Sequence, residues 1–439
     1  MSTKTKALAL LVLAFALLMP GCGGATNGKE TSGKETKDEY GGEPVTLTVW
    51  NQAAGILNDN DLETFLGKPV RDKYPNISFR LITGAKLEEL IAAGETPDFI
   101  TTSNYYLYNL MSLELTDDLS GMIKKEAIDL SKFEPAVVDA LKKFGAKGEI
   151  YGMPFAQNYG ITLYNKDIFD KFGVPYPKDQ MTWNDMIELS RRVTRQDRQD
   201  VYIGLDPGGV QTLVRARSLP VVDETRQKAA LSTEPIKQIF SLLQNLYSIP
   251  GIVQDGGKKY SYGFDYFQKD KKLAMLPYWL AALTSRVPLL NEAGINWDIV
   301  SFPTFPDRPQ YGREVDFHLI VVSKTSKNKE AAYKALKAIV SEEAQRAMNK
   351  NVRLTVLNNP ALRTEFASDL KYYEGKNLAG IFKVQPSPLP MFSEYDDKLY
   401  SYLRNAVTRM VRDKVDINTA LREAEEEGNK YISEQKQLK

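Results

Sequence analysis

Short runs in which apolar and polar residues alternate are separated along the chain by segments with helical spacing. Residues 45–50 (VTLTVW) and 77–82 (ISFRLI) have the β-branched alternation of strands, and 62–74 between them has the pattern of a helix. A second helix is predicted over 86–93, and 97–102 (PDFITT) follows as a third strand. This order predicts an α/β fold with a parallel strand pair and helices on both faces of the sheet.

The residues that follow these strands are the first candidates for a binding site. In open α/β sheets, ligands bind beyond the carboxyl ends of strands. Those positions hold Trp50 and Asn51 after the first strand, and Ser103 and Asn104 after the third. Asn and Ser also close turns at such places, which stays the alternative for the polar residues.

Further along, the chain again alternates between strand and helix signals. Residues 161–165 (ITLYN) form an extended stretch, and Thr182 is a good N-cap for a helix over 183–193. Trp183 falls in the first turn of that helix and Trp297 at the start of a strand, so both are expected to be structural.

The first residues have the pattern of a secretory signal over 1–21. Lys4 and Lys6 precede a 13-residue apolar run, 7–19, which is shorter than the roughly 20 residues that span a bilayer. The sequence LMPGC then resembles the lipobox of bacterial lipoproteins, in which the cysteine becomes the lipidated N-terminus. We therefore expect Cys22 to carry lipid such as palmitate and to anchor the protein at the outer side of the cell membrane. The alternative is an ordinary cleaved signal that leaves a free thiol.

Residues 22–43 contain the lipidated cysteine and a polar, Gly-rich linker in which GKET occurs twice. Such a segment buries too little apolar surface to fold, so a flexible tether is predicted.

Composition narrows the possible chemistry. The chain has 57 Lys and Arg against 56 Asp and Glu, and this balance argues against nucleic-acid binding. One Cys and one His exclude an internal disulfide and a Cys/His zinc site within one chain. His318 lies in an apolar strand, where a hydrogen-bonded structural role is expected and a role in a ligand cleft is the alternative. Residues 195–200 are too poor in oxygen ligands for calcium, and no P-loop is present, so neither metal nor cofactor is expected.

Several longer segments, in their order along the chain, resemble family 1 extracellular solute-binding proteins, the maltose-binding-protein-like receptors of ABC importers. The first is GEIYGMPFAQNYGITLYNKDIFDKFGVPYPKDQMTWNDMIEL over 148–189. The others are AAGETPDFI (92–100), KLAMLPYW (272–279), the segment 301–340, and PSPLPMFSEYDDKLYSYLRNAV (386–407).

The resemblance implies two interleaved α/β lobes joined by a hinge, with a ligand cleft between them, as in type II periplasmic binding proteins. Lobe 1 would comprise 44–156 plus 305–366, and lobe 2 would comprise 157–304 plus 367–439. The hinge is expected near 156–158 and 304–305.

By this resemblance, aromatic side chains would form the walls of the cleft, because the apolar face of a sugar ring packs on an aromatic ring while its hydroxyls need polar partners. The expected aromatic residues are Trp50, Tyr159, Tyr278, Trp279 and Tyr395, and the expected polar ones are Asn51, Ser103, Asn104, Asn158 and Glu394.

The predicted function is a membrane-anchored, monomeric receptor that binds an oligosaccharide and delivers it to the permease of an ABC importer, with no catalytic residues. Two alternatives stay open. One is an extracellular glycan-cleaving enzyme with two carboxyl groups across the cleft. The other is a peptide receptor or a ligand sensor.

Overall fold

The computed structural model describes residues 40–437 of the 439-residue chain, and residues 40–439 form one compact unit. The predicted signal, Cys22 and the linker up to residue 39 lie outside the described residues. Within 40–437, no helix combines the length and apolar character needed to cross a bilayer.

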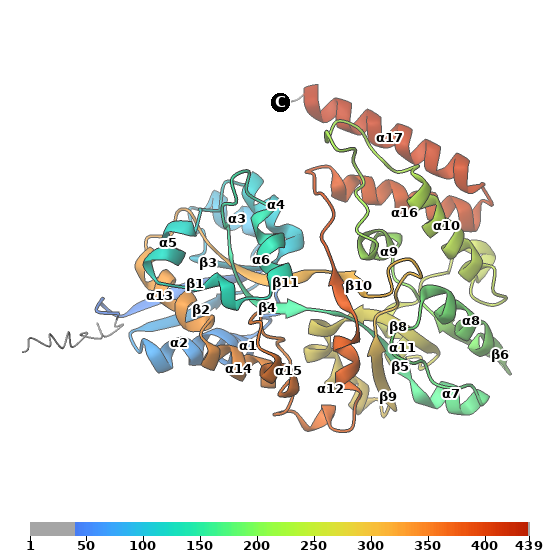
Figure 1. Ribbon diagram of the computed structural model, residues 1–439, viewed down its shortest axis with the longest axis horizontal. Helices are drawn as coiled ribbons and strands as arrows, with labels where there is room; N and C mark the ends of the chain where they lie inside the picture. Colours follow the sequence, from blue (N-terminus) through green and yellow to red (C-terminus); the bar gives the residue numbers. More distant parts are fainter. Residues whose placement is uncertain (1–39, 438–439) are drawn as a thin grey trace, which may run out of the picture. The chain divides into compact units, whose positions relative to one another are not determined.

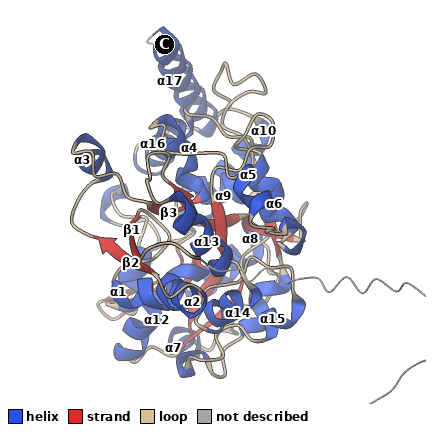
Figure 2. Cartoon of the chain, turned by 90° about the vertical axis from the view of Figure 1, so that its left-hand side faces the viewer, coloured by secondary structure: helices blue, strands red, loops and turns tan. Residues whose placement is uncertain are grey.

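The first of two five-stranded sheets has the strand order β2-β1-β3-β11-β4. β1 pairs in parallel with β2 and β3, whereas β11 is antiparallel to β3 and β4. In Figures 1 and 2, helices α4, α5 and α6 lie above this sheet and α1, α2 and α14 below it. The three strands predicted at the start of the chain are therefore confirmed. The strands are β1 (Val45–Asn51), β2 (Ile77–Ile82), β3 (Phe99–Ser103), β4 (Met153–Asn158) and β11 (Asp316–Val322).

The second sheet has the order β6-β7-β8-β5-β9, and β10 pairs with β12 separately. One hydrophobic core packs on the first sheet, and two further cores pack around the second. The strands are β5 (Gly160–Asn165), β6 (Arg195–Asp197), β7 (Asp200–Leu205), β8 (Leu273–Trp279), β9 (Trp297–Ser301), β10 (Tyr311–Glu314) and β12 (Gln385–Ser387).

The chain passes directly from the first sheet to the second. β4 ends at Asn158 and β5 begins at Gly160, while the return runs through β10 to the start of β11. A Cβ atom at Gly160 would overlap the Arg313 side chain and Phe302, so glycine allows the outgoing and returning segments to lie against each other. The predicted lobe boundaries themselves stay a prediction.

The helices follow local sequence signals. Thr182 caps α8, with Thr182 and Asp185 forming a capping box, as predicted. The predicted helix over 62–74 is instead α1, a π-helical segment Glu63–Gly67 and α2, because Pro69 lacks the N–H that would continue an α-helix. Trp183 and Trp297 are fully buried, as expected for structural residues. The α-helices are α1 (Asp59–Leu62), α2 (Lys68–Lys73), α3 (Leu87–Ala92), α4 (Leu107–Ser112), α5 (Ser120–Lys125), α6 (Pro135–Lys142), α7 (Lys166–Phe172), α8 (Trp183–Val193), α9 (Val210–Ala216), α10 (Glu234–Tyr247), α11 (Gly263–Gln268), α12 (Leu283–Glu292), α13 (Lys329–Ile339), α14 (Glu342–Lys350), α15 (Pro360–Thr364), α16 (Asp396–Arg412) and α17 (Ile417–Gln437).

Candidate functional site

Two adjoining cavities are lined by residues from both sheets. The first, of about 360 Å³, has walls from the loop after β1, from the start of α12 and from Arg353, and is called the Arg353 cavity. The second, of about 270 Å³, has walls from the end of β3, from α9 and from β10, and is called the Arg215 cavity. Four residues line both cavities: Ala53, Asn158, Trp279 and His318.

The topology explains why these residues meet. β1, β3, β4 and β8 present their carboxyl ends to the cavities, and the antiparallel β11 presents its beginning at the same edge. Thus Ser103, Asn158, Trp279 and Asp316, which are far apart in the sequence, become neighbours.

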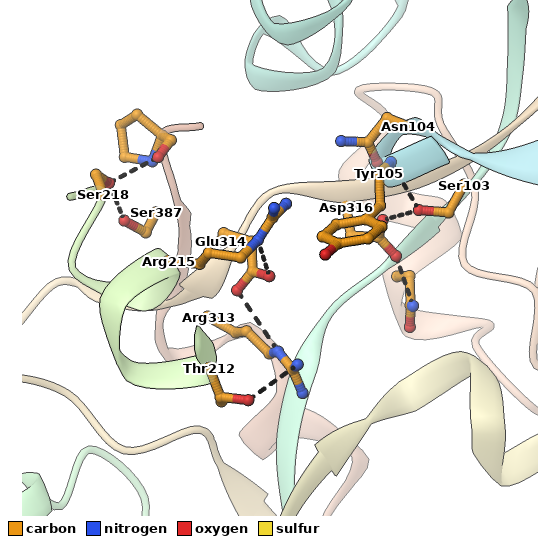
Figure 3. Close-up of polar contacts among 12 residues, drawn as sticks. Ser103, Asn104, Tyr105, Thr212, Arg215, Ser218, Arg313, Glu314, Asp316 and Ser387 are labelled. Carbon is orange, nitrogen blue, oxygen red and sulfur yellow. Dashed lines mark hydrogen bonds and ion pairs between the residues drawn. The ribbon is translucent and has the colours of Figure 1, made fainter. Parts of the chain in front are cut away.

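Asn158 and Asp316 form the polar centre of the site. The Asp316 carboxylate accepts hydrogen bonds from the Ser103 hydroxyl (2.5 Å) and from Asn158 Nδ2 (2.7 Å), as Figure 3 shows. The Asn158 Oδ1 atom accepts from the backbone N–H of Ala281 (2.9 Å), which follows β8 of the second sheet. Asn158 therefore connects the two sheets. Burial raises the pKa of Asp316 to about 6 despite these hydrogen bonds.

A buried ion-pair network forms one wall of the Arg215 cavity (Figure 3). Arg215 Nε lies 2.9 Å from Glu314 Oε1, and Arg313 Nε lies 3.5 Å from Glu314 Oε2. Burial opposes the charged form of Arg215, but Glu314 together with Tyr400 and Tyr105 outweighs it and the pKa of Arg215 is raised. For Arg313, burial dominates and lowers the pKa. The Arg313 guanidinium also lies 3.7 Å from the ring centroid of Trp279, a cation–π contact.

Buried polar atoms without a protein hydrogen-bond partner are concentrated around these cavities. Among the described residues, such atoms include Thr284 Oγ1, Arg313 Nε, Glu314 Oε2, His318 Nδ1, and Arg353 Nε and Nη1. Each of these residues lines one or both cavities. Because buried polar groups in proteins are usually hydrogen-bonded, this arrangement can bind a polar molecule.

His318 does not have the fully hydrogen-bonded environment that the sequence favoured. It is buried in β11, but its Nδ1 atom has no partner and the residue lines both cavities. Burial first, and then the charge of Arg353, lower its pKa to about 3. The imidazole is therefore neutral at physiological pH. The expectation of a satisfied structural histidine is wrong, and the cleft position is the one observed.

Three of the predicted site residues, Ser103, Asn158 and Trp279, are brought to the cavities. Trp50 is not. Its Nε1 atom donates to the Ala85 carbonyl oxygen (3.0 Å), and its ring packs against the first core.

Asn51 does not line either cavity, but its side chain holds the loop that does. Its Oδ1 atom accepts hydrogen bonds from Ala54 N, Ile56 N and Thr101 Oγ1. These bonds fix the loop that follows β1, and that loop lines the Arg353 cavity. The turn-forming alternative therefore describes Asn51 correctly.

Asn104, Tyr159 and Tyr278 also lie away from both cavities. Asn104 is buried and accepts from the backbone N–H of Phe317 (2.8 Å). Tyr159 packs in a core of the second sheet and lines a separate cavity, and Tyr278 stacks on Phe264. Neighbours in an extended chain point to opposite faces, so Asn158 and Trp279 face the cavities while the adjacent tyrosines do not.

Glu394 and Tyr395 lie elsewhere too. Tyr395 belongs to a hydrophobic core and makes an edge-to-face contact with Tyr431. Glu394 lines a further cavity, which shares Arg215 and two tyrosines with the Arg215 cavity. Neither Glu394 nor Tyr395 lines the Arg353 or the Arg215 cavity itself.

Several residues of the site were missed by the sequence analysis. Arg313, Glu314 and Asp316 precede an apolar strand in the sequence GREVDFH, and charged residues this close to a buried strand are a usable signal. Arg215 on α9 and Arg353 after α14 have no comparable local signal. Tyr105 and Tyr106, next to the predicted Ser103 and Asn104, also line the Arg215 cavity.

Within residues 40–437, no group of three or more His, Cys, Asp or Glu side chains is arranged so that it could hold a metal ion.

The two interleaved sheets, the crossing segments and the cavities between them define the class of two-lobed α/β binding proteins. The chain belongs to the bacterial extracellular solute-binding protein family, whose sequence model matches residues 82–369. The resemblance inferred from the sequence is confirmed, and so is the fold class.

Known proteins with the same fold cover almost the whole chain. An ABC substrate-binding protein of Listeria monocytogenes, solved in complex with cycloalternan, is 21% identical with a TM-score of 0.70 and covers 88% of this chain and 99% of its own. The sugar-binding protein MalE of Xanthomonas citri is 15% identical with a TM-score of 0.65, covering 90% and 99%. A mannitol-binding protein of Pseudomonas aeruginosa is 27% identical over 165 residues, about a third of the length of each protein.

Proposed function

We propose that this protein is the receptor of an ABC importer, and that it binds a carbohydrate in the Arg353 and Arg215 cavities and delivers it to the permease. The observation that carries the proposal is the group of buried, unpartnered polar atoms that surrounds a half-buried tryptophan, Trp279.

A carbohydrate fits this combination of groups. The apolar face of a pyranose ring packs on an indole, while its hydroxyls both donate and accept hydrogen bonds. Thr284 can do both, Arg313 donates, and Asp316 and Glu314 accept. Because unpartnered polar groups are costly when buried, a bound polyol that pairs with them gains affinity.

Transport by a clamping motion agrees with the lining of the cavities. Both have walls from the first sheet and from the second, so a solute touches both sides at once. A closed arrangement would be favoured to the extent that the solute contacts it better than the open one. The segments around Asn158 and β10 would act as the hinge, and the permease would recognise the closed form.

The relatives support the choice of ligand. Two similar structures were solved with cycloalternan and with mannobiose bound, and another relative is a mannitol-binding protein. Lipid on Cys22, attachment to the outer side of the membrane, a monomeric state and the lobe boundaries 156/157, 304/305 and 366/367 belong to the same proposal.

A ligand screen tests the proposal directly. The purified protein is heated with neutral mono- and oligosaccharides and with sugar alcohols, and each unfolding temperature is recorded. A ligand present at 100 times its Kd adds about 2.7 kcal/mol to the free energy of unfolding, which is a shift easily measured in a protein of this size. Stabilisation by a carbohydrate supports the proposal.

Two results would count against it. If no carbohydrate stabilises the protein while short peptides do, the peptide-receptor alternative takes its place. If a glycan of the panel is shortened during incubation, the protein is an enzyme. A further experiment separates transport from sensing. Uptake of the bound sugar is measured in cells that lack the permease: loss of uptake supports transport, and unchanged uptake supports sensing.

A further inference from the structure

Arg353 is an unpaired charge in the wall of the Arg353 cavity. Its side chain is 2% exposed and follows α14 in a loop beside the first sheet. Nη2 donates to the Gly55 carbonyl oxygen (2.5 Å), and the guanidinium lies 4.7 Å from the ring centroid of Phe65. Nε and Nη1 have no acceptor, and Arg353 has no ion pair within residues 40–437.

This situation differs from that of the other buried arginines of the site. Arg215 and Arg313 share the carboxylate of Glu314, and the charge of Asp316 also acts on both, so that two arginines are set against two carboxyl groups inside the protein. A buried charge without a partner is costly, and the cost of Arg353 is not met by any carboxylate at ion-pair distance. Burial accordingly lowers its pKa to about 10, which still leaves it charged at neutral pH.

The surroundings of Arg353 add neutral polar groups and one acid. His318 Nδ1 and Thr284 Oγ1 line the same cavity and lack partners. Asp61 also lines it, and its charge partly offsets the effect of burial on the pKa of Arg353 without forming an ion pair. One oxygen of Asp61 accepts from the backbone N–H of Leu57 (2.9 Å). The cavity therefore combines a positive charge that has no ion-pair partner with neutral polar groups.

We propose that the Arg353 cavity binds an acidic group of the solute, so that the protein is a receptor for an acidic carbohydrate, one with a uronic acid unit. This inference rests on the proposed function and narrows its ligand class. A carboxylate has the charge and planar shape that match the guanidinium, and charge-assisted hydrogen bonds are about twice as strong as neutral ones. Sulfate esters share this anionic chemistry and are separated by the experiment.

The test compares matched ligands by titration calorimetry. Glucuronic and galacturonic acid disaccharides are each paired with the neutral disaccharide of the same linkage, and a sulfated disaccharide forms a further arm. The expected result is at least tenfold tighter binding of a uronic acid disaccharide than of its neutral counterpart. Equal or tighter binding of the neutral sugar overturns the acidic-ligand inference but leaves the proposed function standing. Preference for the sulfated sugar alone also overturns the assignment to a carboxylate.

Variants locate the effect. Arg353→Gln should weaken the acidic ligand at least tenfold more than it weakens the neutral one, whereas Asp61→Asn should strengthen the acidic ligand by removing a like charge. Arg346→Gln is the matched control, since Arg346 on α14 is more exposed and is paired with Glu342. An unchanged acidic preference in Arg353→Gln contradicts the proposal. If that variant fails to fold, the comparison of matched ligands on the natural protein decides.

A non-sugar arm separates the two proposals. Succinate is added in the thermal-shift format to the natural protein and to Arg353→Gln. If no carbohydrate binds but succinate stabilises only the protein with Arg353, the proposed function fails while an anion site at Arg353 stands. If neither binds, both fail.

Discussion

The Arg353 and Arg215 cavities share four residues but differ in whether their buried charges have ion-pair partners. In the Arg215 cavity, two arginines are balanced by two carboxyl groups, Glu314 and Asp316, which both line it. In the Arg353 cavity, a single buried guanidinium has no paired carboxylate. Charges that are paired within the protein need no charged group from the ligand. A buried charge without an ion-pair partner favours a ligand that carries the opposite charge. We therefore expect changes in the Arg215 cavity to act mainly on stability and changes in the Arg353 cavity mainly on specificity.

The largest effect is expected from Glu314→Gln. This variant leaves the buried Arg215 and Arg313 charges unpaired, and breaking a buried ion pair typically costs about 3–5 kcal/mol. The free energy of unfolding, measured by urea denaturation, should fall by that amount. Glu342→Gln removes one partner of an exposed pair and should cost under about 1 kcal/mol. Equal effects of the two variants would show that the Arg215 cavity is not internally compensated.

Trp279→Ala tests the part that the two cavities share. Because Trp279 lines both, its loss should weaken binding of the solute about 100-fold, or about 2.7 kcal/mol, while the unfolding temperature changes little. Trp50→Ala is the matched control, since Trp50 lines neither cavity and should change affinity less than threefold. Calorimetric titration of both variants with the ligand found in the screen distinguishes them. A similar loss in both would place Trp50 in the site after all.

A change spread over a range of pH is expected from the titration of Asp316. Its pKa is raised from 3.8 to about 6 in the folded protein, so the folded state holds this proton more tightly than the unfolded state. The group therefore favours folding below pH 3.8, and this contribution is lost as the pH rises through 6, at most about 3 kcal/mol.

Asp316→Asn removes that dependence. The difference in unfolding free energy between the natural protein and the variant should shift against the natural protein between pH 4 and 6.5. Asp396, whose pKa burial also raises to about 6, is present in both proteins and cancels in the difference. A difference that stays constant across this window would mean that Asp316 titrates at its ordinary pKa.

The fold could be predicted from the sequence further than the site could. The strands at 45–51, 77–82 and 99–103 and the helix capped by Thr182 follow from local alternation and capping, which need no distant partner. Trp279 and Asn158 were expected from the family resemblance, and Ser103 from its place after a strand. Trp50 also ends a strand, yet its ring points to the core, since the direction of a terminal side chain depends on the neighbouring elements.

Charged residues were the part of the site that the sequence did not reveal. Arg215 and Glu314 are separated by about a hundred residues along the chain and meet only because β10 passes beside α9. Arg353 is one arginine among many, and nothing next to it in the sequence shows that it is buried. Pairing or its absence is a property of the assembled fold.

The way the loop after β1 is held has a consequence for the evolution of ligand specificity in such receptors. The side chains of Asn51, Asp61 and Arg353 bind its backbone, so the shape of the loop depends little on the identity of Ala53 or of the exposed Leu57. After gene duplication, substitutions at these two positions would change ligand preference at one end of the site. Asn158 and Trp279 would continue to contact the part of the ligand that both proteins bind.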